Sequence, residues 1–353
     1  MTGVPRVGLR PDYEISKIIR GGWQLSGDHG SVEAARAVED IVAFYDAGIT
    51  TFDCADIYTG VEELYGRGLR HLAKLRGAEA AGRMKIHTKC VPDRDKLGRL
   101  TRDDLAGTIQ RSLRRLGRER LDLVQFHWWN YDAPGCMEAV GWLGELQAEG
   151  LIDRIGITNF DRAHMVSIAN TVDLVSAQVQ FSLLDRRPAG PFAVDAATHG
   201  VHILCYGVLA GGFLTDAWLG QPDPGHDFEN RSLVKYRLVI DEFGGWDAFQ
   251  DLLALLASIG DRQGADVAAV AVRAMLDDPF ASAVIVGARY ARHLPRLLKA
   301  LEVTLEDSDW SAIRSLQRRA TGPGGDVYEL ERDATGRHGR IMKYNLNAVG
   351  DAG

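Results

Sequence analysis

Short runs of aliphatic and β-branched residues alternate with longer segments of helical periodicity along most of the chain. Runs typical of β-strands begin near Ser16, Ile49, Met84, Leu121, Ile152, Asp173, Val201 and Ala283. Successive starts are separated by 33, 35, 37, 31, 21, 28 and 82 residues, and such intervals suit strand–helix units better than hairpins. Eight units of this kind predict an α/β protein whose parallel strands close into a (β/α)8 barrel of the TIM type.

The helical segments between these strands have recognisable ends. Apolar residues from Val38 to Tyr45 follow the spacing of one helix face, with Ser31 as a candidate cap and Gly48 at the expected end. The same pattern recurs after Thr101 and stops at a glycine. No Gly-x-Gly-x-x-Gly turn follows the first strand, so an open, doubly wound sheet is disfavoured.

One domain is expected over residues 1–353, with two irregular segments. Residues 214–246 are rich in Asp, Gly, Pro and Asn, and we expect a lid-like loop there, followed by helices over 246–259 and 267–275. Residues 322–353 follow the last helix and mix glycine with charged residues and tyrosines. This C-terminal tail is either docked or partly disordered.

Composition restricts the class of protein. The 353 residues are 46% hydrophobic and 25% charged, as in soluble domains with a large core. Forty-one basic against 48 acidic residues give a net charge of -7, which disfavours a nucleic-acid partner. No apolar stretch has the length of a signal peptide core or a membrane span, so we expect a cytoplasmic protein with no membrane partner. The four cysteines lack CxxC spacing, and no pattern indicates an oligomeric state.

Polar and aromatic side chains follow the expected strands at the point where each strand ends. They are Asp53, Lys89, His127, Thr158, Asn159, Gln178 and Tyr206. The carboxyl ends of the strands form the active-site face of a parallel barrel. Charged groups at this face cost desolvation energy, which a barrel selected for stability alone avoids. The pattern therefore predicts a catalytic or binding site.

Asp53, Tyr58, Lys89 and His127 form a set suited to proton donation. A lysine cation beside a phenol stabilises phenolate and lowers the pKa of the tyrosine, while Asp53 would keep Lys89 protonated. A neutral His127 can hydrogen-bond a substrate carbonyl oxygen. No metal is needed, and a third His or Cys ligand at suitable spacing is missing. The set suits protonation of a developing alkoxide.

Reduction of a carbonyl also requires a hydride, which a nicotinamide can supply. Its ring needs an aromatic face, which Tyr206 offers, and hydroxyl or amide partners, which Thr158, Asn159 and Gln178 offer. The two halves of the barrel mouth would then have complementary roles.

These residues also have a purely structural interpretation. Asp53 with Lys89 could be an ordinary ion pair, and Tyr206 an ordinary barrel aromatic. Thr158 and Asn159 could simply cap the helix that follows. Their gathering at one end of several strands favours the functional interpretation.

The chain resembles the aldo-keto reductases, most specifically over Gly48-Ile-Thr-Thr-Phe-Asp53-Cys-Ala-Asp-Ile-Tyr58. Further matching stretches are Glu62–Gly66, Ile86–Lys89, Leu121–His127, Ile155–Phe160, Gln178–Gln180 and Ile203–Gly212, so the resemblance runs from about residue 16 to residue 320. It implies an NAD(P)-dependent oxidoreductase that interconverts an aldehyde, ketone or sugar and its alcohol. It also implies Tyr58 as general acid, Lys89 and Asp53 as its tuning pair, and His127 as the group that orients the carbonyl.

The same resemblance implies cofactor contacts. The residues are Gly22, Trp23, Asp53, Thr158, Asn159, Gln178, Tyr206, Gly207, Leu209, Gly211, Gly287, Arg289 and His293. Among them, Tyr206 would stack on the nicotinamide and residues 207–211 would run beside the pyrophosphate. Trp23 and Trp128, with Trp129 next to it, are expected to wall the substrate pocket.

The family pattern is not kept where the adenosine end is expected to bind. His293, Arg296 and Leu297 stand where the family commonly has Arg or Gln followed by Glu-Asn. Arg289, Arg292 or Arg296 can still meet a 2′-phosphate, because the guanidinium fork matches phosphate geometry. NADP is therefore the expected cofactor, with NADPH preferred over NADH.

Two other functions stay open. One is an NADPH-binding regulatory subunit that docks on a partner protein, as similar proteins serve membrane channels. The other is a Schiff-base aldolase that uses Lys89 as its amine. Asp53 beside Lys89 disfavours a neutral amine, and the intact catalytic set favours an oxidoreductase with a small-molecule carbonyl or alcohol substrate.

Overall fold

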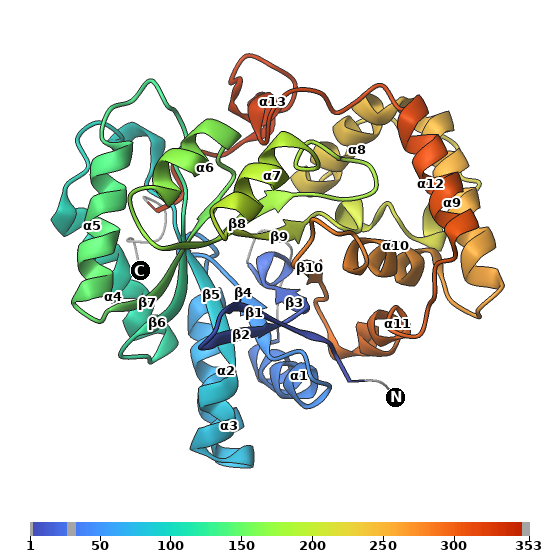
Figure 1. The fold of residues 1–353 in the computed structure, drawn as a ribbon. Helices are drawn as coiled ribbons and strands as arrows, with labels where there is room; N and C mark the ends of the chain where they lie inside the picture. Colours follow the sequence, from blue (N-terminus) through green and yellow to red (C-terminus); the bar gives the residue numbers. More distant parts are fainter. Residues whose placement is uncertain (1–2, 27–32, 348–353) are drawn as a thin grey trace.

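A computed structural model describes residues 3–26 and 33–347 (Figure 1). Within these residues, eight parallel strands form a closed barrel in the order β10-β3-β4-β5-β6-β7-β8-β9. The barrel strands are β3 (Ile18–Gly21), β4 (Thr51–Asp53), β5 (Lys85–Cys90), β6 (Leu121–Phe126), β7 (Ile152–Thr158), β8 (Leu174–Gln180), β9 (His202–Tyr206) and β10 (Ala283–Gly287). The predicted (β/α)8 barrel is confirmed, and each strand begins within two residues of the start inferred from the sequence.

Helices cover the outside of the barrel (Figure 1). The helices are α1 (Ala34–Asp46), α2 (Val61–Arg76), α3 (Ala78–Arg83), α4 (Arg102–Leu116), α5 (Cys136–Ala148), α6 (Arg162–Ala169), α7 (Pro191–Thr198), α8 (Arg231–Phe243), α9 (Gly245–Asp261), α10 (Val267–Leu276), α11 (Leu294–Lys299) and α12 (Asp307–Arg319). As expected, Thr101 caps α4, in a capping box with Asp104, and Gly117 ends it with a φ of 66°. Ser31, the candidate cap of α1, lies outside the described residues.

An antiparallel hairpin precedes the barrel, and sequence analysis did not predict it. Its strands are β1 (Arg6–Arg10) and β2 (Tyr13–Ser16). Tyr13 and Ile15 pack among inward-facing residues of the barrel, and Arg10 bonds Asp173 and Gly200, which precede β8 and β9. The hairpin therefore closes the amino end of the barrel, opposite to the face where the strands end.

The segment expected to be a lid-like loop is only partly irregular. Residues 214–230 contain one 3-10 turn, η5 (Asp216–Trp218), but α8 occupies most of the remainder. Asn230 caps α8, since its side chain accepts a hydrogen bond from the backbone N–H of Ser232. The expectation of a loop over all of 214–246 is therefore wrong, because the local Asp, Gly and Pro content does not extend into α8.

The C-terminal tail is docked over residues 322–347, where it forms α13 (Glu329–Arg332) and the 3-10 turn η7 (Gly339–Ile341). Arg332 donates to the carbonyls of Trp128, Trp129 and Asn159 at 2.5, 3.0 and 2.6 Å. Asn347 donates to the carbonyl of Val91 at 2.8 Å. The tail thus crosses the carboxyl ends of β5, β6 and β7, which places it beside the active-site face.

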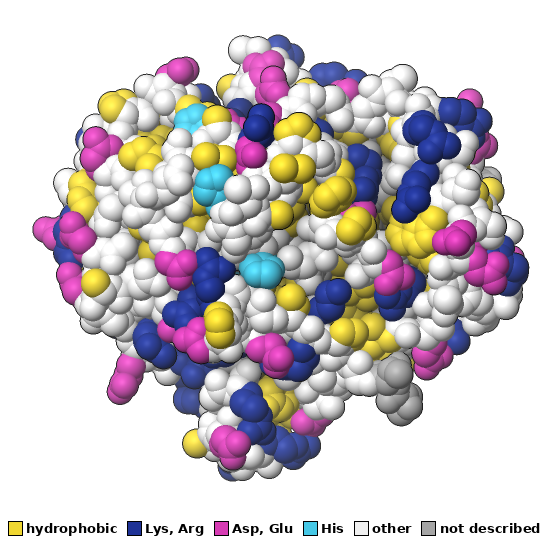
Figure 2. Space-filling model, viewed as in Figure 1, with side chains coloured by type: hydrophobic (Ala, Val, Ile, Leu, Met, Phe, Trp, Pro, Cys, Tyr) yellow, Lys and Arg dark blue, Asp and Glu magenta, His cyan; other side chains and the backbone are white. Residues whose placement is uncertain are grey.

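Basic and acidic side chains are interspersed over the face of the molecule drawn in Figure 2, with no broad area of one sign. Of the helices in residues 3–26 and 33–347, none is long and apolar enough to cross a bilayer.

Candidate active site

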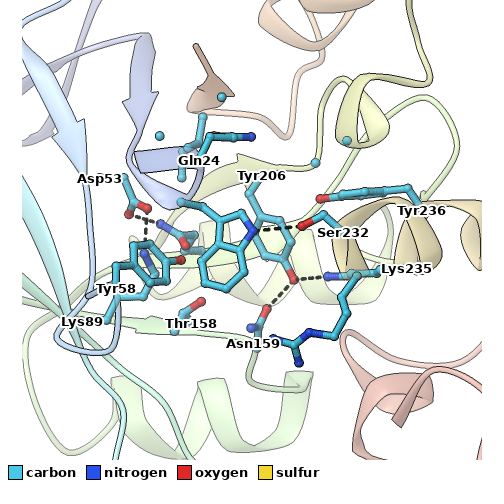
Figure 3. Close-up of a pocket in the computed structure, with 18 of the residues that line it drawn as sticks. Gln24, Asp53, Tyr58, Lys89, Thr158, Asn159, Tyr206, Ser232, Lys235 and Tyr236 are labelled. Carbon is cyan, nitrogen blue, oxygen red and sulfur yellow. Dashed lines mark hydrogen bonds and ion pairs between the residues drawn. The ribbon is translucent and has the colours of Figure 1, made fainter. Parts of the chain in front are cut away.

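A cavity of about 490 Å³ lies at the carboxyl ends of the strands. Its wall includes all the residues singled out at strand ends, namely Asp53, Lys89, His127, Thr158, Asn159, Gln178 and Tyr206, together with Tyr58. Further wall residues that the sequence did not single out come from α8 (Arg231, Ser232, Lys235 and Tyr236) and the tail (Tyr328, Ile341, Met342 and Leu346). Figure 3 shows Asp53, Lys89 and Tyr58 on one side of this cavity and Tyr206 with the α8 residues on the other.

Asp53 and Lys89 form a buried ion pair. Lys89 Nζ donates to Asp53 Oδ2 at 2.7 Å and to the carbonyl of Cys54 at 2.8 Å. The other carboxylate oxygen of Asp53 accepts from Gln125 at 2.9 Å and Gln178 at 2.6 Å. Burial opposes the charge on Lys89, but the Asp53 carboxylate outweighs it and the pKa of Lys89 is raised. Lys89 is therefore a fixed cation, which argues against a Schiff-base aldolase.

Tyr58 faces this cation. Lys89 Nζ lies 5.0 Å from the centroid of the Tyr58 ring, and Trp23 packs edge-on against the same ring at 4.9 Å. Burial raises the pKa of Tyr58, and although Lys89 favours the phenolate, burial has the larger effect. Lys89 thus lowers the pKa of Tyr58 as expected, but burial outweighs this effect and the phenol stays protonated.

His127 is buried and neutral. Its Nδ1 lies 2.9 Å from the carbonyl oxygen of Thr158, and Nε2 has no hydrogen-bond partner among the described residues. Burial and the nearby Arg332 lower the pKa of His127 to about 3. A carbonyl oxygen only accepts, so Nδ1 carries the ring proton and Nε2 presents a lone pair. Nε2 is the ring nitrogen left without a partner among the described residues, and the expected role of His127 toward a substrate carbonyl stays a prediction.

The opposite wall is built around Tyr206. Its hydroxyl donates to Asn159 Oδ1 at 2.8 Å and accepts from Lys235 Nζ at 3.3 Å. Asn159 adopts a left-handed conformation, with a φ of 62°, and the cap of α6 is Asp161. The structural alternative in which Thr158 and Asn159 cap that helix is therefore wrong. Burial lowers the pKa of Lys235, an α8 residue that the sequence did not single out.

The turn after β9 is covered by α8. Gly207 and Gly211 have φ angles of 76° and 65°, in the region that favours glycine. A Cβ added at Gly207 would lie 2.7 Å from the Tyr236 hydroxyl, and one at Gly211 would lie 2.6 Å from Tyr236 Cδ2. The Trp23 indole N–H donates to the Ser232 hydroxyl at 2.9 Å. Helix α8 therefore also contacts the loop that follows β3, across the cavity. Asn230, which caps α8, is the sequence signal that could have predicted this helix.

Two residues that were expected to contact the substrate or the cofactor do not line the cavity. Trp128 is fully buried and donates to the carbonyl of Ala133, whereas Trp129 lines the cavity. The assignment of Trp128 to the substrate pocket is wrong because successive side chains of an extended segment point to opposite faces. The backbone N–H of Gly22 donates to the carbonyl oxygen of Asp53, and a Cβ added at Gly22 would lie 2.7 Å from the same oxygen. Gly22 is therefore buried against β4, and Gly21 lines the cavity instead.

The arginines at the expected adenosine end separate into two groups. Arg289, Arg292 and Arg36 lie around the ring of Tyr290, with guanidinium carbons 4.8 to 5.3 Å from its centroid. Arg296 instead pairs with Asp266 at 2.5 Å and Asp216 at 3.4 Å. Gly287 and Leu209 line the cavity, while Arg289 and His293 lie outside its wall.

Fold and site together define a (β/α)8-barrel protein with a set of ionisable side chains at the carboxyl ends of its strands. The model of the Aldo/keto reductase family matches residues 17–318, and the chain belongs to this family. It is 28% identical to a 6-dehydroglucose reductase of Agrobacterium fabrum, over 88% of this chain and 97% of that protein. It is 24% identical to an NADH-specific methylglyoxal reductase of Escherichia coli, over 86% and 95%.

Solved structures also share the fold. A glycerol dehydrogenase of Gluconobacter oxydans superimposes with a TM-score of 0.74 at 23% identity, covering 92% of this chain and 98% of that one. The family and its reductase-named members support an oxidoreductase function.

Proposed function

We propose that this chain is an NAD(P)H-dependent oxidoreductase that interconverts a carbonyl compound and its alcohol, with Tyr58 as the general acid. The observation that carries the proposal is the buried Lys89–Asp53 pair beside Tyr58, in a cavity whose opposite wall is Tyr206. Such a pair can stabilise the phenolate that forms when a phenol loses its proton. It contributes little to folding stability, because burying two charges is costly.

The opposite wall fits a nicotinamide cofactor. Tyr206 is held at its hydroxyl by Asn159 and Lys235, which fixes the ring as a stacking face. Arg231 and Lys235 bring two cationic side chains to the same wall, and cations suit the charged pyrophosphate of such a cofactor. When bound, the cofactor supplies the hydride.

The chain's own residues handle the proton. Tyr58 donates its hydroxyl proton to the carbonyl oxygen as negative charge develops there. Lys89 stabilises the phenolate left behind, and Asp53 keeps Lys89 charged and oriented. Both side chains of the pair are only 6% exposed, so the interaction operates with little screening by water.

Tyr58→Phe tests this assignment. The variant should lose at least about 10²-fold in turnover, followed at 340 nm, because general acid catalysis contributes on that order. Binding of the cofactor, measured by fluorescence quenching, should be retained, since Tyr58 is not on the Tyr206 wall. The matched control is Tyr131→Phe, whose hydroxyl bonds the backbone of Asp161 away from the cavity. A Tyr58→Phe protein that keeps its turnover would contradict the assignment.

Among cofactors, we favour NADPH. The support is the group of Arg36, Arg289 and Arg292 around the ring of Tyr290. Tyr290 is three residues after Gly287, which lines the cavity. Guanidinium groups on an aromatic ring suit an adenine with a 2′-phosphate. Wild-type protein that binds a cofactor but turns over no carbonyl or alcohol would instead favour the regulatory-subunit alternative.

A further inference from the structure

The carboxyl ends of β6 and β7 are joined differently from those of their neighbours. Just past the ends of the strands, backbone hydrogen bonds still connect β4 to β5, β5 to β6, β7 to β8 and β8 to β9. The bonded pairs are Cys54–His87, His127–Cys90, Asn159–Gln178 and Phe181–Tyr206, at 2.8, 3.1, 3.0 and 3.1 Å. Within residues 3–26 and 33–347, no such backbone bond connects the segments that follow β6 and β7.

The side chain of Arg332, in α13 of the tail, supplies the missing connection. It donates to the carbonyls of Trp128 and Trp129, which follow β6, at 2.5 and 3.0 Å. It also donates to the carbonyl of Asn159, which follows β7, at 2.6 Å. Hydrogen bonds from a guanidinium group are charge-assisted and stronger than neutral ones. A single side chain of the tail thus clamps two strand ends of the barrel.

Arg332 makes this contact without a counter-ion. It is partly buried and has no carboxylate partner in the part of the chain that the structure describes. Its guanidinium carbon lies over the ring of Tyr131, 3.8 Å from the centroid. A cation without a counter-ion costs free energy when it leaves water, so a residue that only anchored the tail would favour a carboxylate partner.

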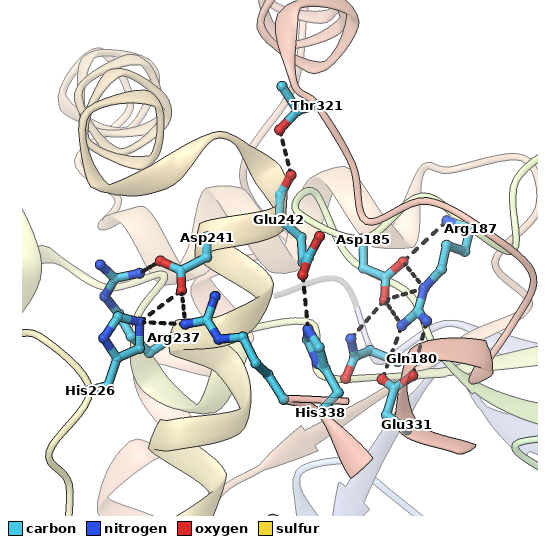
Figure 4. A network of polar contacts seen from close by, with 11 residues as sticks. Gln180, Asp185, Arg187, His226, Arg237, Asp241, Glu242, Thr321, Glu331 and His338 are labelled. Atoms are coloured by element: carbon cyan, nitrogen blue, oxygen red, sulfur yellow. Dashed lines mark hydrogen bonds and ion pairs between the residues drawn. The ribbon is translucent and has the colours of Figure 1, made fainter. Parts of the chain in front are cut away.

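The tail already has such a paired anchor at Glu331, as Figure 4 shows. The two carboxylate oxygens of Glu331 accept from Arg187 at 2.9 and 3.0 Å, and Arg187 also pairs with Asp185 at 2.7 Å. All three side chains are at most 2% exposed. Because this network holds α13 on the segment after β8, the contacts of Arg332 have a purpose other than anchoring.

The contact with Asn159 leads into the cavity. Asn159 has a φ of 62°, in the left-handed region that is disfavoured for residues with a side chain. Gln178 accepts from its backbone N–H, Arg332 donates to its carbonyl, and its side-chain oxygen accepts from the Tyr206 hydroxyl at 2.8 Å. Asn159 and Tyr206 line the cavity, whereas Arg332 does not. Arg332 therefore reaches the cavity through Asn159.

We propose that Arg332 is a positioning residue for the nicotinamide half of the cofactor. It holds Asn159 in the conformation that directs its side chain at Tyr206, so the amide and the stacking face are in place before the cofactor binds. The adenosine half, which we assign to the arginines around Tyr290, does not depend on Arg332. This inference rests on the proposed oxidoreductase function, with the nicotinamide at Tyr206.

Isothermal titration calorimetry with NADPH and with 2′,5′-ADP tests the proposal, because 2′,5′-ADP lacks the nicotinamide half. Arg332→Met keeps an apolar stem for the Tyr131 ring and removes the donors. Its Kd for NADPH should rise roughly tenfold, the effect of about one charge-assisted hydrogen bond. Its Kd for 2′,5′-ADP should stay as in wild type. Arg332→Lys retains the charge without the fork and should show an intermediate rise for NADPH alone.

Arg337→Met is the matched control. Arg337 is also a tail arginine, but it pairs with Asp241 of α8 at 2.8 Å and bonds neither β6 nor β7. This variant should bind both compounds as wild type does. Equal weakening of NADPH binding in Arg332→Met and Arg337→Met indicates a loosened tail and overturns the proposal. Equal losses for NADPH and 2′,5′-ADP in Arg332→Met overturn it too. Should Arg332→Met not fold, Arg332→Lys alone carries the same comparison.

The outcomes also separate this inference from the proposed function. An Arg332→Met protein that binds NADPH as tightly as wild type overturns the positioning role and leaves the oxidoreductase function intact. Wild-type protein that binds neither NADPH nor NADH overturns both. If wild type binds NADH alone, NADH and ADP replace NADPH and 2′,5′-ADP in the same comparison.

Discussion

At the scale of single residues, burial decides which groups hold protons. Tyr58 keeps its proton because desolvation outweighs the attraction of Lys89, whereas Lys89 keeps its charge because Asp53 outweighs desolvation. The same competition leaves His127 neutral. The site thus has a protonated phenol, a lasting cation and a neutral imidazole side by side, which is the arrangement a proton donor to an alkoxide requires.

The arginines at the proposed adenosine end give the first residue-scale prediction. Arg292→Gln should raise the KM for NADPH roughly tenfold and change the KM for NADH little, because only NADPH carries the 2′-phosphate. Arg296→Gln is the control, since Arg296 is already paired with Asp216 and Asp266. Steady-state kinetics with both cofactors measures the ratio. Equal losses with NADPH and NADH in Arg292→Gln would rule out a phosphate contact.

Sequence reasoning found the residues whose position follows from a strand and missed those whose position follows from packing. Asp53, Lys89 and Gln178 were identifiable because strand ends of a parallel barrel share one face. Lys235 and Tyr328 were not, because the sequence does not show that α8 and the tail reach the cavity, which they do through long-range contacts. The lowering effect of Lys89 on the pKa of Tyr58 was predictable, but the net rise of this pKa was not, since burial is a property of the whole site.

At the scale of elements, close helix contacts depend on single glycines. Gly66 of α2 is buried against the last turn of α4, where an added Cβ would contact the carbonyl of Arg115 and lie 3.0 Å from Leu116. The neighbouring atoms are backbone, which moves only with the whole helix. The position of α2 matters for the site because the loop before it carries Tyr58.

A pair of substitutions tests this contact. Gly66→Ala should lower the free energy of unfolding by about 2 kcal/mol, the cost of forcing extra volume into a packed contact. Gly107→Ala, on the exposed face of α4 with nothing within 4 Å of the new Cβ, should raise it by about 0.5 to 1 kcal/mol. Urea unfolding measures both. Stabilisation by both substitutions would show that the two helices are free to move apart.

At the scale of the whole molecule, the barrel divides its two ends between stability and chemistry. The hairpin β1–β2 closes the amino end, and the tail with α8 encloses the carboxyl end. The barrel itself was predictable, because alternating patterns at regular intervals permit few other folds. The hairpin was not predicted, and the tail with α8 was predicted only in part. The apolar residues of these segments have packing partners only once the barrel is formed.

The interior between these two ends holds a histidine that ties stability to pH. His87 is fully buried in β5, and burial lowers its pKa to about 4 from an ordinary value near 6.5. Between these values the unfolded chain binds a proton at His87 and the folded chain does not, so stability is full above pH 6.5 and declines as pH falls toward 4. His127 acts in the same direction, while Asp56, whose pKa burial raises to about 8, opposes it over this range.

Replacing the histidine isolates its share of this pH dependence. In His87→Gln, the slope of unfolding free energy against pH between 6.5 and 4.5 should change by about 1.4 kcal/mol per pH unit, the value of one proton. The variant should lose less stability on acidification than wild type, because the contributions of His127 and Asp56 are common to both proteins. Urea unfolding at several pH values provides the two curves. Parallel curves would mean that His87 binds its proton equally well in both states, so that the barrel interior reaches water.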